Sequence, residues 1–487
     1  MRLHKLFIML SAIIVLATSC TDFDALNIDP VRLNKVNPGS LLNPVLYDLA
    51  INNWNQYNSY TFQLMQGKVS LVSTNTYTWY VLDESTGDSR YSTSYRLLNN
   101  IILMEQMAEE LNEPNYVAVG MTLRSYIFHI LTDMFGNVPM TEACKAREKN
   151  FTPVFDDQKA IYRQILKDLK DANDLFITAA SGAGAGLRYN GEGDFLYGAS
   201  GASTASATAI GNWKRFCNSL RLRVLMRVID VPEFNALQEI RAILADPTAY
   251  PIFTSNANAA LMQISGVAPM QAPMTNIASF RNNVRASQFF VETFKLWNDP
   301  RLPYYATESG GAGSGYHGLQ EGYVTVPAGN TSEPNQQYAQ WPLKICLMGY
   351  AEIEFIKAEL AQRGLIEANA EEAYKKGVEA AILQWERGIT FPAGYFDNEH
   401  TVYNGTLERI LFQKFHALFF CDYQQWFEYA RTGLPEIPRG PGVAPSNRMP
   451  QRLTYPVILQ RTNMTNYQDA RNAMGGDDHY IKLFWQK

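Results

Sequence analysis

The sequence contains little cysteine or histidine and no excess of basic charge. It has 5 Cys and 6 His in 487 residues, and its net charge is −5. Without clusters of Lys and Arg, it offers no electrostatic basis for binding nucleic acid. The internal cysteines lie far apart and show no CxxC spacing, which argues against a zinc site. We expect buried free thiols, with one long-range disulfide left open, at Cys144, Cys217, Cys346 and Cys421.

Recognisable catalytic motifs are also absent. There is no HExxH sequence, and Gly67-Lys68 is followed by Val69, which excludes a phosphate-binding loop of the Walker type. Ser314 lacks the GxSxG frame of a hydrolase elbow. We therefore expect a protein that is not an enzyme and that has no cofactor or metal site. The 47 acidic residues leave one alternative open, a surface glycoside hydrolase with two carboxylates facing each other across a cleft.

Apolar runs long enough to cross a membrane are missing, but a short one opens the chain. Arg2 and Lys5 precede an apolar stretch from Leu6 to Ala17, and Cys20 follows closely. A bilayer needs about 20 apolar residues, so this stretch is typical of a secretory signal. The cysteine at the cleavage point predicts a lipoprotein in which residues 1–19 are removed and Cys20 carries the lipid anchor. Turn-forming residues then predict an extended leader over 20–40.

Most of the remaining chain has helical periodicity. Ile161, Ile165 and Leu169 recur in steps of four, which places them on one face of a helix over 161–176. Helices 348–363 and 370–386, joined near Gly364, are similar to a tetratricopeptide hairpin. We expect a mostly α fold in a single body over 41–487, with loop-rich insertions near 181–211, 251–286 and 306–342. Further helices are predicted over 91–111, 115–135, 213–229, 287–297 and 406–430.

Aromatic side chains alternate with amides in two regions. The apolar C–H face of a sugar ring can lie on an aromatic ring, while its hydroxyl groups pair with amide and guanidinium groups. Large aromatics are also common core residues, so each position has a structural alternative. The candidate ligand-binding residues are Trp54, Tyr57, Tyr77, Trp79, Tyr80, Trp297, Arg301, Tyr304, Tyr305 and Trp341.

Several segments, in order, resemble the SusD/RagB family of nutrient-binding outer-membrane lipoproteins of Bacteroidetes, in its second SusD-like branch. One departure is that Leu459-Gln460 stand where the family usually has an acid. The similar segments are Cys20–Pro30, Leu131–Pro139, Asn212–Arg223, Gly349–Glu352 with Ala358-Glu359, Glu428–Pro435 and Arg452–Pro456.

The resemblance implies a scaffold of tetratricopeptide-like helix pairs with an irregular, loop-rich ligand lobe. It also implies a lipid-anchored protein at the outer membrane that faces the cell exterior. Such a protein would bind a glycan or another nutrient and deliver it to a SusC-type TonB-dependent transporter. A gating subunit that binds a peptide or no ligand is a further alternative. The family's ligand residues share no motif, so none is carried over to this chain.

Overall fold

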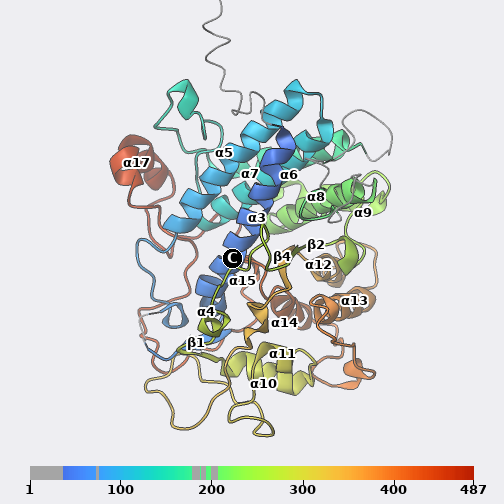
Figure 1. The fold of residues 1–487 in the computed structure, drawn as a ribbon, viewed down its shortest axis with the longest axis vertical. Helices are drawn as coiled ribbons and strands as arrows, with labels where there is room; N and C mark the ends of the chain where they lie inside the picture. The colour runs from blue at the N-terminus through green and yellow to red at the C-terminus, as the bar shows by residue number, and fades with distance from the viewer. Residues whose placement is uncertain (1–36, 73–75, 178–186, 188–192, 199–206, 487) are drawn as a thin grey trace, which may run out of the picture.

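The computed structural model describes residues 37–72, 76–177, 187, 193–198 and 207–486. The predicted signal peptide, Cys20 and the leader as far as residue 36 lie outside the described residues. The described chain is mostly helical, which confirms the predicted fold class (Figure 1). Within these residues, no helix combines the length and apolar character that crossing a bilayer requires.

Long helices from the first half of the chain pack against one another in the upper half of Figure 1. Asp157 caps the amphipathic helix α7, because its side chain accepts hydrogen bonds from the backbone N–H groups of Lys159 and Ala160 at 3.0 and 3.2 Å. These helices are α3 (Pro38–Gln56), α5 (Asp88–Glu110), α6 (Pro114–Phe135), α7 (Gln158–Leu175) and α8 (Ala207–Arg227).

The predicted hairpin is present as α12 (Tyr350–Gln362) and α13 (Ala370–Leu383), which pack together and against α14 (Leu407–Ala417). Gly364 ends the first helix of the pair with φ of +66°, a conformation that favours glycine. Gly377 lies against the ring of Phe355, so a side chain at this position would crowd the two helices.

Shorter elements complete the fold. Strand β1 (Lys68–Ser70) pairs with β3 (Val284–Ala286), and β2 (Ala260–Ile264) pairs with β4 (Leu343–Met348), both antiparallel. A π-helix, Tyr57–Thr61, continues α3 into α4 (Phe62–Leu64). The other α-helices are α9 (Ala236–Ala245), α10 (Gln288–Trp297), α11 (Leu302–Tyr305), α15 (Gln424–Thr432), α16 (Leu459–Thr462) and α17 (Met464–Ala473).

Three predicted boundaries differ from the structure. The leader was expected to reach residue 40, but α3 begins at Pro38, where the Asn37 side chain caps the helix. The loop expected over 181–211 ends earlier, because α8 begins at Ala207. The single helix expected over 406–430 is two helices, α14 and α15, because Phe420 and Asp422 have φ of +55° and +40°. A left-handed backbone cannot continue a right-handed helix.

Buried ion pairs join the two groups of helices in the core. The Arg227 guanidinium on α8 lies 3.1 Å from the Asp133 carboxylate of α6 and 2.8 Å from that of Glu428 on α15. Glu428 also accepts a hydrogen bond of 2.6 Å from Lys414 on α14. Burial raises the pKa of Glu428, but the neighbouring cations Arg431, Lys414 and Arg227 outweigh it and hold that pKa well below its usual range.

The same network continues through α12. Arg431 contacts both oxygens of Glu359 at 2.8 and 2.6 Å, and Glu428 at 2.8 Å. Arg223 makes a separate two-bond contact with Glu352 at 2.8 and 2.6 Å. Most of these buried charges lie in the segments that resembled a known family, so those segments help to hold the interior of the fold together. Arg227 and Lys414 are the exceptions.

Candidate functional site

The exposed side of the β2–β4 sheet carries a group of polar side chains. Gln263 and Lys344 are direct partners across the two strands, so their side chains lie on the same face. Gln263 is exposed between the buried residues Met262 and Ile264, as the alternation of a strand requires. β4 packs against helix α3, which fixes the sheet to the helical scaffold.

Trp341 lies two residues before β4 and has 41% of its surface exposed. Its indole lies against Gly266, two residues beyond the end of β2. Gly266 has φ of +82°, and a Cβ atom there would overlap the indole ring. The Gly266 backbone therefore packs against the indole ring, and the exposed part of the ring is accessible to a ligand.

A hollow of about 250 Å³ lies next to this segment, and its wall includes Pro342, the residue that follows Trp341. Its wall includes Lys344, whose Nζ lies 2.5 Å from a carboxylate oxygen of Glu386. Glu386 has φ of +48°, which is uncommon for a residue with a side chain and often marks a functional site. We call Gln263, Trp341, Pro342, Lys344, Glu386 and Arg387 the Trp341 surface.

Buried and half-buried aromatic residues hold this surface in place. The Tyr304 hydroxyl donates a 2.7 Å hydrogen bond to the Arg387 carbonyl. The Trp54 indole N–H donates to the Tyr338 carbonyl at 2.8 Å. The Tyr338 ring meets Trp385, which also lines the hollow, edge to face at 5.7 Å. Two predicted residues, Trp54 and Tyr304, thus contribute by positioning the site.

The predicted ligand residues divide according to burial. Trp341 is exposed, and Tyr77 and Tyr304 are half-buried. A fully buried ring presents no face to a ligand, so burial argues against direct contact for the others and gives them a packing role. Arg301, for example, is occupied by Asp299 at 2.7 Å. The buried residues are Trp54, Tyr57, Trp79, Tyr80, Trp297, Arg301 and Tyr305.

Sequence analysis missed five members of the surface, namely Gln263, Pro342, Lys344, Glu386 and Arg387. None lies in a local motif. Antiparallel pairing brings Gln263 and Lys344 together from segments 81 residues apart, and the segment that follows α13 adds Glu386 and Arg387. The only local indication was the Trp341-Pro342 step in a glycine-rich stretch.

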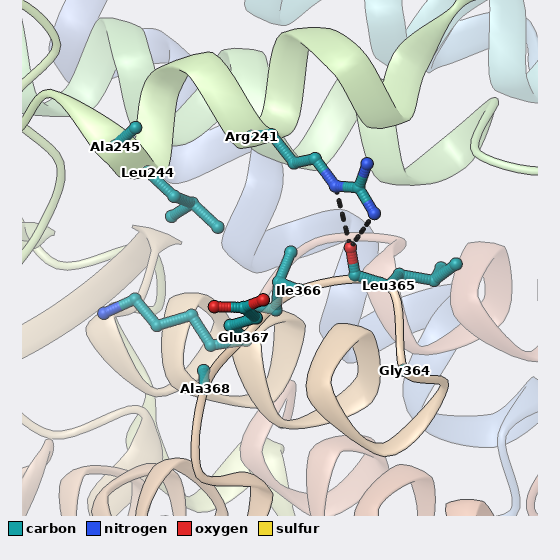
Figure 2. Close-up of a pocket in the computed structure, with 9 residues that line it drawn as sticks. Arg241, Leu244, Ala245, Gly364, Leu365, Ile366, Glu367 and Ala368 are labelled. Atoms are coloured by element: carbon teal, nitrogen blue, oxygen red, sulfur yellow. Dashed lines mark hydrogen bonds between the residues drawn. The ribbon is translucent and has the colours of Figure 1, made fainter.

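A larger hollow, of about 700 Å³, lies between α9 and the turn that joins α12 to α13. Figure 2 shows the Arg241 side chain spanning it and donating two hydrogen bonds to the Leu365 carbonyl, at 2.9 and 2.7 Å. The described residues that line this hollow include no aromatic side chain. It therefore lacks the flat apolar surface that a sugar ring would use.

The internal cysteines are free thiols in the structure. Cys217, Cys346 and Cys421 are buried, as expected, whereas Cys144 is partly exposed. Burial raises the pKa of Cys144 to about 11. Among the residues that the structure describes, no group of three or more His, Cys, Asp or Glu side chains is placed to hold a metal ion.

Comparison with known proteins places the chain in a class of helical binding proteins that associate with the outer membrane. The chain belongs to the SusD-like family, whose model is described as "Starch-binding associating with outer membrane" and matches residues 30–456. This confirms the resemblance found in the sequence. A search of curated proteins gave no match.

Solved structures share the fold. A SusD-like protein of Bacteroidetes has a TM-score of 0.77 at 20% identity, and the match covers 93% of this chain and 100% of that one. A chitin-binding protein has a TM-score of 0.78 at 23% identity, with 92% and 100% covered. A SusD homologue from Bacteroides fragilis has a TM-score of 0.74 at 23% identity, with 93% and 100% covered. At these identities the likeness establishes the fold.

Proposed function

We propose that this protein is an outer-membrane lipoprotein that binds a glycan at the Trp341 surface and delivers it to a SusC-type TonB-dependent transporter. Lipidation at Cys20 would anchor the chain, with the body facing the cell exterior. The family's association with the outer membrane supports this location. The family's role as binding proteins supports capture of a ligand without cleavage of its bonds.

The exposed Trp341 indole carries the proposal. A sugar has an apolar ring face and hydroxyl groups around its edge, which suits an exposed indole next to a hollow lined by amide, ammonium, carboxylate and guanidinium groups. An open surface of this kind binds by complementarity, and affinities in the micromolar range are ample for capture. Tyr304 would act from beneath by holding the Arg387 backbone.

Replacing Trp341 tests the proposal. We expect Trp341→Ala to weaken glycan binding about tenfold or more, because the stacking surface is lost. Calorimetry or a glycan array would measure it. Phe151→Ala is a matched control, because Phe151 is 71% exposed and lies outside the Trp341 surface.

The outcomes separate the possible functions. Equal binding by the wild type and folded Trp341→Ala would remove Trp341 from the site. New reducing ends released from a polysaccharide would identify a hydrolase and contradict a pure binding role.

A further inference from the structure

The Trp341 surface carries an excess of positive charge. It has two basic side chains, Lys344 and Arg387, and one acidic side chain, Glu386. Glu386 pairs with Lys344. Arg387 forms no ion pair with a carboxylate in the described part of the chain. The whole chain has a net charge of −5, so this local excess runs against the average.

The Arg387 guanidinium lies close to Trp341. Its Nη2 donates to the carbonyl oxygens of Gln340 and Pro342 at 3.2 and 3.3 Å, which are the residues on either side of Trp341. Its other N–H groups make no hydrogen bond to described residues. Partial burial lowers the pKa of Arg387, and no acid offsets this. The structure thus holds a half-buried cation with unused donors, bonded to the backbone on both sides of an exposed aromatic residue.

We propose that the ligand is an acidic oligosaccharide, whose carboxylate pairs with Arg387 while a sugar ring lies on Trp341. A guanidinium presents parallel N–H groups that match the two oxygens of a carboxylate, and such charge-assisted bonds are stronger than neutral ones. The Lys344–Glu386 pair beside it can serve the hydroxyl groups. This inference rests on the proposed function, because it specifies the glycan that the same surface binds.

Paired probes with the same sugar backbone test the carboxylate. Tetragalacturonate and its fully methyl-esterified form differ only at the carboxyl groups, which are charged in the first and neutral and methylated in the second. A panel of other uronate, sulfated and neutral oligosaccharides extends the comparison. We expect the wild type to prefer uronate over ester or neutral forms. Arg387→Gln should weaken uronate binding about tenfold and change neutral binding by about twofold or less.

Two further variants separate recognition from a structural effect. Arg387→Lys keeps the charge but loses the parallel donors, so it should retain part of the preference. Arg96→Gln removes a positive charge from an exposed pair with Asp48, outside the Trp341 surface, and should leave the preference unchanged. A merely structural role for Arg387 would weaken charged and neutral ligands equally, so the ratio between them is the decisive measurement.

Each outcome has a defined meaning. Neutral glycans that bind through Trp341, with no effect of Arg387→Gln on the ratio, would overturn the inference and leave the proposed function intact. Arg387-dependent binding of sulfated sugars but not uronates would overturn the carboxylate assignment. Binding of no oligosaccharide in the panel would overturn the glycan function as well.

Discussion

Glu428→Gln should destabilise the protein more than any exposed charge change. The carboxylate of Glu428 contacts Arg227, Lys414 and Arg431 in the core. The neutral amide would leave buried cations without their shared anion. Removing one partner of a buried ion pair costs about 3–5 kcal/mol, because the remaining charge cannot be hydrated. For a chain of this size, that free energy corresponds to a fall in Tm of about 3–5 °C.

Urea unfolding followed by circular dichroism measures this change, with Glu371→Gln as the control. Glu371 pairs with Lys375 at 2.7 Å on the surface of α13, where its side chain is 49% exposed. An exposed pair of this kind contributes about 0.3–0.5 kcal/mol. If the two substitutions changed the free energy of unfolding by similar amounts, the network would contribute no more than surface charge, and the reasoning would be refuted.

The pH dependence gives a second measurement on the same variant. The pKa of Glu428 is lower in the folded state than the usual 4.5, so the unfolded chain binds the proton more readily. Its stabilising contribution is therefore present above pH 4.5 and is lost as the pH falls through the folded pKa. Glu428→Gln should show a smaller loss of stability between pH 4.5 and lower values than the wild type.

Two other substitutions have definite expected outcomes. Burial lowers the pKa of Lys68 to about 7. Its Nζ donates a hydrogen bond to the Asn58 amide oxygen, and it forms no ion pair with a carboxylate of the described chain. The contribution of Lys68 to stability should therefore become more favourable as the pH rises from about 7 to 10.5. Lys68→Met should raise the free energy of unfolding at pH 7 by about 1–4 kcal/mol, and its advantage over the wild type should shrink across this range, as measured by urea titration. Gly266→Ala should displace the Trp341 indole, so glycan binding measured by calorimetry should fall about as far as in Trp341→Ala, while stability falls by about 1–2 kcal/mol.

Much of the fold followed from periodicity in the sequence. The step of four from Ile161 to Leu169 located α7 to within a few residues. Helix α3 was not predicted, because Asn and Gln residues and an internal Pro44 obscure its apolar face. The break between α14 and α15 was missed as well, because it depends on backbone angles at Phe420 and Asp422 that tertiary packing imposes.

The site was less accessible to sequence reasoning. An aromatic residue beside amides has the same local pattern whether it is exposed or packs in the core, and Trp341 and Trp54 illustrate the two cases. Burial depends on contacts between distant segments, which one sequence does not display. Arg387 shows the same limit, because its position beside Trp341 arises from hydrogen bonds to Gln340 and Pro342 across 45 or more residues.

The buried ion pairs of the interior network and the exposed charges of the Trp341 surface should respond differently to salt. Mobile ions screen exposed charges over about 8 Å at physiological ionic strength, but they do not enter a packed core. Arg227, Glu428 and Arg431 are shielded from them, whereas Glu386 and Arg387 are not. Raised ionic strength would therefore weaken the proposed pairing of a ligand carboxylate with Arg387 while the scaffold keeps its shape.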